Sequence, residues 1–250
     1  MAIKENLETF AVKTALKYLN KDPENNIPKL LDMFEILDVK NEFAPIFDSI
    51  RLAVNDKNSN WYKLILSLWQ DIDPGVRNRL FENFVIKGSI AGYKKQEENK
   101  ARYNCNIPWA ILMDPTSACN LNCTGCWAAE YGNHMNLSYE EMDDIVNQGV
   151  ELGTYIYLFT GGEPLVRRRD IIKLCENHPD CVFSAFTNGT LIDEDFADEI
   201  LRVKNFVPAI SIEGFEKETD SRRGLGTYNK ILNAMDILKR KRLPFGKAWL

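Results

Sequence analysis

Three cysteines, Cys119, Cys123 and Cys126, stand within eight residues of one another. Thiolates are soft ligands that suit zinc and iron–sulfur clusters. A [4Fe–4S] cluster has four irons and usually takes four thiolates, so three cysteines would leave one iron open to another ligand. The same spacing would also fit one face of a helix, but Asn120 and Gly125 between the cysteines favour a loop. The sequence therefore predicts a loop that directs three thiols to one centre.

A zinc site is the alternative for the same cysteines. Zinc usually takes four ligands, often four cysteines or three cysteines and a histidine, and His134 follows Cys126 by eight residues. Structural zinc sites commonly pair their cysteines, whereas Cys105, Cys175 and Cys181 are scattered and are expected to be structural. A zinc-stabilised binding module that uses Cys119, Cys123, Cys126 and His134 stays open at this point.

The composition excludes several classes of protein. The chain has 250 residues, of which 45% are hydrophobic and 27% charged, as in globular proteins. A net charge of -5 gives no electrostatic support for nucleic-acid binding. We expect no membrane span, because no apolar run reaches about 18 residues, and no signal peptide. The expected location is the cytoplasm, where clustered cysteines indicate metal or redox chemistry rather than disulfides.

The hydrophobic pattern changes near residue 105. Before it, apolar residues recur at helical spacing, as they do from Trp61 to Trp69. After it, short β-rich runs alternate with helical ones, which is typical of parallel βαβ units. We therefore predict an all-α domain over residues 1–105 and an α/β domain over 106–250. The predicted strands are 107–113, 155–159, 181–186, 206–212 and 243–250, and the predicted helices are about 138–152, 168–177, 193–203 and 227–240.

Local signals mark two of the helix starts. Ser138 and Glu141 have the spacing of a capping box. Thr227 is expected to cap the last helix. Both starts agree with the predicted alternation of strands and helices.

Polar residues follow the predicted strands in three places. The run 160–164, Thr-Gly-Gly-Glu-Pro, follows the second strand, and 187–190, Thr-Asn-Gly-Thr, follows the third. Ser211 and Glu213 alternate with isoleucines at the end of the fourth strand, which places both on one face. Glycines let a backbone approach a ligand closely, and polar side chains at the carboxyl ends of barrel strands point to a site. Each run alone also fits an ordinary turn.

The spacing Cys-x3-Cys-x2-Cys, with Trp127 directly after it, resembles the signature of the radical S-adenosylmethionine (radical SAM) superfamily. The resemblance implies a [4Fe–4S] cluster held by Cys119, Cys123 and Cys126, with S-adenosylmethionine on the fourth iron. One-electron reduction would cleave this cofactor to a 5′-deoxyadenosyl radical that takes hydrogen from a substrate. It also implies a partial (βα) barrel, with about five of six units in residues 106–250.

The resemblance also implies roles for the polar runs. The glycines, Glu163 and Pro164 match a Gly-Gly-Glu-Pro motif that contacts the methionine amino group. Ser211 and Arg223 would hold the methionine carboxylate, because a guanidinium binds a carboxylate with two parallel bonds, and Glu213 would reach the ribose hydroxyls. The cofactor-binding residues expected from the resemblance are Trp127, Gly161, Gly162, Glu163, Pro164, Asn188, Ser211, Glu213 and Arg223.

The resemblance covers about 106–243 and assigns nothing to residues 1–105. Relatives usually have a sixth unit, and many have further cysteines for auxiliary clusters, so we expect a form truncated at the C-terminus. A cluster-binding fragment without turnover is a further alternative. Residues 220–224 resemble the Asp-x-x-Arg-Gly of SPASM and other peptide-modifying relatives, which favours a peptide substrate, while a lipid or small metabolite stays open. The resemblance also implies a one-electron donor such as flavodoxin or ferredoxin.

Overall fold

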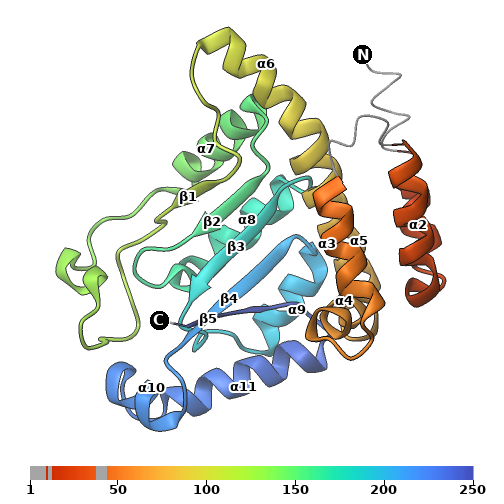
Figure 1. Ribbon diagram of the computed structural model, residues 1–250. Helices are drawn as coiled ribbons and strands as arrows, with labels where there is room; N and C mark the ends of the chain where they lie inside the picture. Colours follow the sequence, from red (N-terminus) through yellow and green to blue (C-terminus); the bar gives the residue numbers. More distant parts are fainter. Residues whose placement is uncertain (1–9, 11–12, 38–43, 250) are drawn as a thin grey trace. The chain divides into compact units, whose positions relative to one another are not determined.

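A five-stranded parallel sheet organises the second part of the chain (Figure 1). The computed structural model describes residues 10, 13–37 and 44–249. Neighbouring strands pair in sequence order, and every pair is parallel, which confirms the predicted α/β fold. The strands are β1 (Ile111–Met113), β2 (Ile156–Phe159), β3 (Val182–Thr187), β4 (Phe206–Ile212) and β5 (Gly246–Trp249).

Helices connect the strands close to the positions that the sequence predicts. They are α7 (Tyr139–Leu152), α8 (Arg168–Asn177), α9 (Glu194–Val203), α10 (Glu216–Arg223) and α11 (Thr227–Arg240). The capping box at the start of α7 is confirmed, because Ser138 Oγ accepts from Glu141 N (3.1 Å) and Glu141 Oε2 accepts from Ser138 N (2.7 Å). Helix α10 was not predicted, because its eight residues carry almost no apolar stripe.

The predicted cap of α11 is wrong. Thr227 is the first residue of the helix, and its hydroxyl donates to the Arg223 carbonyl. The capping group is instead the Asp220 carboxylate, which accepts from Gly226 N (2.7 Å) and Tyr228 N (2.8 Å). These backbone N–H groups lower the pKa of Asp220. The end of α10 and the start of α11 are thus joined by one side chain.

Aromatic side chains fill the face of the sheet that the helices cover. Tyr157, Phe159 and Phe183 are fully buried, and Phe183 stacks on both of the others. The Tyr157 hydroxyl bonds to the carbonyls of Val146 and Thr154 at 3.0 Å each, which ties β2 to α7. Because side chains alternate along a strand, Ser211 of β4 and Phe186 of β3 lie on the opposite face of the sheet. Phe186 is exposed there.

The compact units of the structure divide between Asn78 and Arg79, ahead of the boundary that the sequence predicts at residue 105. The π-helix η1 (Glu82–Gly92) and helix α6 (Tyr93–Tyr103) belong to the α/β unit. The buried Asn83 amide donates to the carbonyls of Pro179 (2.9 Å) and Cys181 (2.8 Å). Gln96 of α6 donates to the Gly153 carbonyl. These side-chain bonds explain why the segment groups with the sheet.

The first unit is helical. Its helices include α2 (Pro23–Leu37), α3 (Ala44–Asn55), α4 (Asn60–Gln70) and α5 (Pro74–Phe81), the last of which runs across the division. Ile27, Leu31 and Val54 form its buried cluster, against which Phe47 and Trp69 pack. No helix in the described residues is long and apolar enough to cross a membrane.

The contact between α7 and β2 makes a first prediction. A Cβ on Gly149 would lie 2.3 Å from the Tyr157 hydroxyl oxygen, so Gly149→Ala should destabilise the protein by about 1–2 kcal/mol despite the better helix propensity of alanine. Tyr157→Phe removes that oxygen, so the double variant should be less destabilised than the sum of the two single variants. Urea denaturation followed by circular dichroism measures all three.

Gly88→Ala is the control, because its added Cβ would meet nothing closer than 3.4 Å. Equal losses of stability at Gly149 and Gly88 would show that the Tyr157 contact is not the cause.

Candidate functional site

The three cysteines line one cavity of about 320 Å³. The loop that carries them follows β1, and each cysteine is partly buried and free of disulfides. Burial raises the pKa of the Cys119 and Cys123 thiols, although Leu121 N donates to Cys119 Sγ. Metal coordination would deprotonate such thiols outright. The structure therefore brings together the three thiols that the sequence singles out.

The donor set of this cavity fits an iron–sulfur cluster better than a zinc ion. Across the described residues, no three His, Cys, Asp or Glu side chains stand close enough to bind one metal ion. His134 lines a neighbouring cavity instead. In a cluster each thiolate binds its own iron, so the ligands need not meet at a single ion. Three thiols with no histidine among them thus match the soft donor set of a cluster.

The turn after β2 holds the start of the cysteine loop through its backbone. Gly162 N donates to the Thr116 carbonyl (2.9 Å) and Glu163 N to the Ala118 carbonyl (2.8 Å). A Cβ on Gly162 would lie 2.3 Å from the Ala118 carbonyl oxygen. Gly161 has a φ of +102°, and its Cβ would lie 2.7 Å from the Thr116 carbonyl oxygen. Here the glycines let two backbone segments meet, whereas the sequence argument explained them by the approach of a ligand.

Glu163 joins the same turn to the end of β3. Its Oε1 accepts from Leu165 N (2.9 Å) and Thr187 Oγ1 (2.7 Å), and its Oε2 accepts from Asn188 N (2.7 Å). Burial raises the pKa of this carboxyl, while the donors and the charge of Arg223 act in the opposite direction. Pro164 begins the short helix η3 (Pro164–Arg167), which Glu163 caps. Glu163 is therefore a structural link as well as a candidate cofactor ligand.

Side chains of the turn after β3 form hydrogen bonds with the cysteine loop. Asn188 Nδ2 donates to Asn120 Oδ1 (2.9 Å), and Asn120 Nδ2 donates to Thr190 Oγ1 (2.8 Å). Asn188 Oδ1 also accepts from Thr190 N (2.9 Å). The sequence argument treated Asn120 only as a loop former. The hydrogen bond between Asn120 and Asn188 joins residues almost seventy positions apart. The sequence around Asn120 therefore gives no indication of this contact.

Two arginines at the end of α10 meet Glu213 beyond β4. Arg223 binds this carboxylate with two bonds, Nε to Oε2 (2.6 Å) and Nη2 to Oε1 (2.7 Å), and Arg222 Nη1 adds a third to Oε1 (2.7 Å). Burial lowers the pKa of the Arg223 guanidinium, but the hydrogen bonds and charge of Glu213 act more strongly, so that the pKa is raised. From the sequence, Glu213 was expected to bind the ribose and Arg223 the methionine carboxylate of the cofactor. In the structure the two side chains form an ion pair with each other. Ser211, which precedes Glu213 by two residues, is buried near the end of β4.

Arg222 continues this chain of contacts into the cysteine loop. Its carbonyl accepts from Thr124 N at 2.8 Å, and its Nε lies 3.4 Å from the Thr124 carbonyl. The charge of Arg223 also acts on Cys123, where it lowers the pKa against the effect of burial. Sequence reasoning missed Arg222 and Thr124, because only the folded chain brings α10 to the loop.

Trp127 does not line the cysteine cavity but an adjoining one of about 520 Å³. Its ring meets Tyr131 edge-on, with ring centroids 5.8 Å apart, on the short helix η2 (Trp127–Tyr131). Ser117 and Ala128 line both cavities, so the two lie next to each other. Gly161 and Gly162 also border the larger one.

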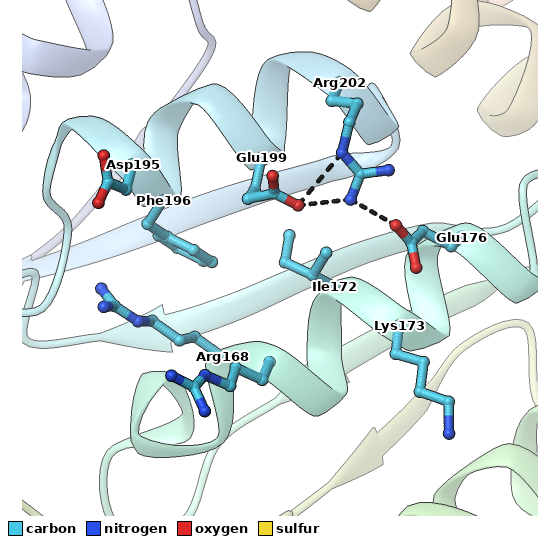
Figure 2. Close-up of a pocket in the computed structure, with 9 residues that line it drawn as sticks. Arg168, Ile172, Lys173, Glu176, Asp195, Phe196, Glu199 and Arg202 are labelled. Carbon is cyan, nitrogen blue, oxygen red and sulfur yellow. Dashed lines mark hydrogen bonds and ion pairs between the residues drawn. The ribbon is translucent and has the colours of Figure 1, made fainter.

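A third cavity, of about 350 Å³, lies between α8 and α9 and holds none of the predicted site residues. Figure 2 shows Phe196 and Ile172 at its centre and Arg202 in contact with both Glu176 and Glu199. Arg168 pairs with Asp193 (2.7 Å). Arg168 and Arg202, two of the four cationic residues that line this groove, thus have carboxylate partners, so we describe it as a partly salt-bridged surface between two helices.

The comparisons with known proteins agree with this geometry. The family model of the Radical SAM superfamily matches residues 113–247, which is more than half of the chain. The protein belongs to the radical SAM superfamily. Its members use a [4Fe–4S] cluster and S-adenosylmethionine (AdoMet).

Individual relatives match part of the chain. An uncharacterized protein of Archaeoglobus fulgidus is 34% identical over 147 residues, which are 57% of this chain and 34% of that protein. The AdoMet-dependent heme synthase of Methanosarcina barkeri is 28% identical over 146 residues, 56% of this chain and 42% of the synthase. The chain thus spans less than half the length of these relatives. The structure of Streptococcus suis SuiB bound to S-adenosylmethionine aligns with a TM-score of 0.51 at 14% identity, over 78% of this chain and 48% of SuiB, and shows the shared fold.

The bonds of Glu163 make a second prediction. Glu163→Gln places an NH2 group where an oxygen now accepts from Thr187 or Asn188, so one buried donor loses its acceptor. We expect a loss of about 2 kcal/mol in the free energy of unfolding, measured by urea denaturation. Glu140→Gln, at an exposed position on α7, is the control and should change little.

The same variant tests the titration of Glu163. A carboxyl whose pKa is raised on folding contributes most to stability at low pH, and this contribution falls as pH rises from the unfolded value, near 4.3, through the folded value. The stability difference between wild type and Glu163→Gln should therefore shrink over this interval. A difference that grew with pH would show that the folded pKa is not raised.

Proposed function

We propose that this chain binds a [4Fe–4S] cluster through Cys119, Cys123 and Cys126 and cleaves S-adenosylmethionine reductively. The observation that carries the proposal is the convergence of these three thiols on one cavity, within a loop that is hydrogen-bonded to the turns after β2 and β3 and to the end of α10. Three thiolates leave one iron for the amino and carboxylate groups of the cofactor. When bound, the cluster and S-adenosylmethionine supply a 5′-deoxyadenosyl radical that abstracts hydrogen from a substrate.

The protein's own part is to hold the loop and to present polar groups beside it. Glu163 Oε2 accepts one bond from Asn188, and a carboxylate oxygen has capacity for a second, so it can receive an amino group. Arg223 keeps Nη1 outside its two bonds to Glu213, so it can donate to a carboxylate while Glu213 fixes its orientation. The remaining cofactor contacts that we assign are Trp127, Gly161, Gly162, Pro164, Asn188, Ser211 and Glu213.

The final reaction involves a substrate and an electron source. We propose a peptide as the substrate, which the likeness of residues 220–224 to peptide-modifying relatives supports. An external one-electron donor such as flavodoxin or ferredoxin would supply the electron, and the proposed location is the cytoplasm. The second candidate function is cluster binding without turnover, for which the three thiols of the cavity are sufficient.

Removal of one loop thiol tests the proposed ligands. After anaerobic reconstitution, Cys119→Ala and Cys126→Ala should lose most of the bound iron and sulfide and at least a hundredfold of the rate of 5′-deoxyadenosine formation with dithionite, because a missing ligand removes the reacting centre rather than tuning it. Cys105→Ala is the matched control, since Cys105 is exposed and outside the cavity, and it should keep both properties.

The outcomes separate the hypotheses. A Cys119→Ala variant with a full cluster signal and unchanged 5′-deoxyadenosine formation contradicts the proposed ligand set. Zinc without iron or sulfide after anaerobic purification would support the binding module. A wild-type chain that assembles the cluster but never cleaves S-adenosylmethionine would support the fragment without turnover.

A further inference from the structure

The larger cavity beside the cysteine loop gathers exposed apolar side chains. Trp127, Tyr131 and Met135 all line it, and they are 57%, 53% and 55% exposed. Exposed large apolar side chains are common singly, but their grouping around one cavity marks a binding site. A volume of about 520 Å³ is also within the range of ligand pockets.

The backbone around this cavity is held in place before any ligand binds. Ser117 N donates to the Met135 carbonyl (2.8 Å), and Met135 N donates to Ser117 Oγ (3.1 Å). Thr116 and Asn136 form a β-bridge and share a side-chain hydrogen bond. The segment that carries Met135 is therefore fixed to the segment that precedes the cysteines, and a ligand would meet a formed wall.

The cavity also lies where a reacting substrate would have to be. It shares Ser117 and Ala128 with the cavity of the three thiols. Hydrogen transfer needs the donor and acceptor atoms in near contact. This step rests on the proposed function, because it takes the cysteine cavity as the place where the radical forms.

The charge of the lining selects among classes of ligand. Asp114, an exposed residue just after β1, contributes a carboxylate to the lining of this cavity. The described lining residues include no Lys or Arg. Arg167, which donates to the carbonyls of Pro115 and Leu137, is paired with Asp170 at 2.7 Å. A nucleoside triphosphate or a carboxylated tetrapyrrole would place several negative charges beside Asp114 with no Lys or Arg of the described lining to receive them, and with His134 as the one lining side chain that can become cationic. Aromatic faces next to a carboxylate suit a cation and an apolar group instead.

We propose that the cavity lined by Asp114, Tyr131 and Met135 is the substrate subsite, and that it binds a peptide segment with an aromatic or apolar side chain next to a cationic one. Trp127, Gly161 and Gly162 line the same cavity and form its border with the proposed cofactor site. The exposure of its walls favours a segment of a longer chain, which can continue out of the cavity on either side. Asp114 and Tyr131 are then specificity-determining residues. They act on substrate choice and not on assembly of the cluster.

Photo-crosslinking of the anaerobically reconstituted full chain tests this subsite. The probe is 4-benzoylphenylalanyl-lysine amide, and 4-benzoylphenylalanyl-glutamate is its anionic counterpart. Mass spectrometry should find the lysine probe on residues 127–137, at about threefold or more above the glutamate probe, as expected for an exposed charge pair. Excess lysyl-tyrosine amide should suppress labelling, whereas GTP, coproporphyrin III and tyramine should not.

Two variants and their controls complete the test. Asp114→Asn should abolish the preference for the lysine probe, and Tyr131→Ala should lower labelling about fivefold, as expected for loss of an aromatic contact. Tyr103→Ala is a matched control, because Tyr103 is 52% exposed on α6, and Asp236→Asn is the control for the charge. Neither should change labelling.

Several results would overturn the proposal. They are labelling confined to residues that do not line the cavity, equal labelling by the two probes, full suppression by tyramine, which would assign the site to a small amine, and displacement of the probe by S-adenosylmethionine, which would assign it to the cofactor. Formation of 5′-deoxyadenosine is measured on the same preparations. Labelling that persists without this product would contradict the proposed function alone, and product without labelling would contradict the subsite alone.

Discussion

The contact on which the site depends is the one between the turn after β2 and the backbone that leads into the cysteine loop. Gly162 and Glu163 donate their N–H groups to the carbonyls of Thr116 and Ala118. Two main chains approach so closely that no side chain fits at Gly162, since a Cβ there would lie 2.3 Å from a carbonyl oxygen. The position of the first thiol relative to the sheet follows from this contact, because Cys119 comes directly after Ala118.

The other attachments of the loop come from the turn after one strand and from the end of a helix. Asn120 is held by the turn after β3, and Thr124 is held by Arg222 at the end of α10. The loop has little apolar surface of its own, so it is positioned by polar bonds rather than by burial. A loop built in this way depends on the sheet beneath it: the stacked Tyr157, Phe159 and Phe183 fix the strand ends, and the strand ends fix the loop.

The sequence was sufficient for the parts that follow from local pattern. The alternation of apolar runs predicted the parallel sheet, and Ser138 with Glu141 marked the start of α7, because both signals lie within a few neighbouring residues. The spacing of the cysteines predicted the convergence of the thiols. The sequence could not show that Glu213 pairs with Arg223, or that Asn120 meets Asn188, because such pairs depend on which strand ends become neighbours. The predicted cap at Thr227 was wrong for the same reason. The start of α11 is capped instead by Asp220, which lies on the preceding helix α10.

The bond between Thr124 and Arg222 has a consequence for the order of folding. These residues are 98 positions apart in the chain, and contacts at such separation form late because their loop-closure entropy is not repaid until the intervening elements have folded. On a ribosome, the cysteines emerge long before α10 is synthesised, so the thiol loop spends that time without one of its attachments. We therefore expect the thiol loop to reach its final position only after α10 has been synthesised, with the thiols of the nascent chain open to oxidation until then.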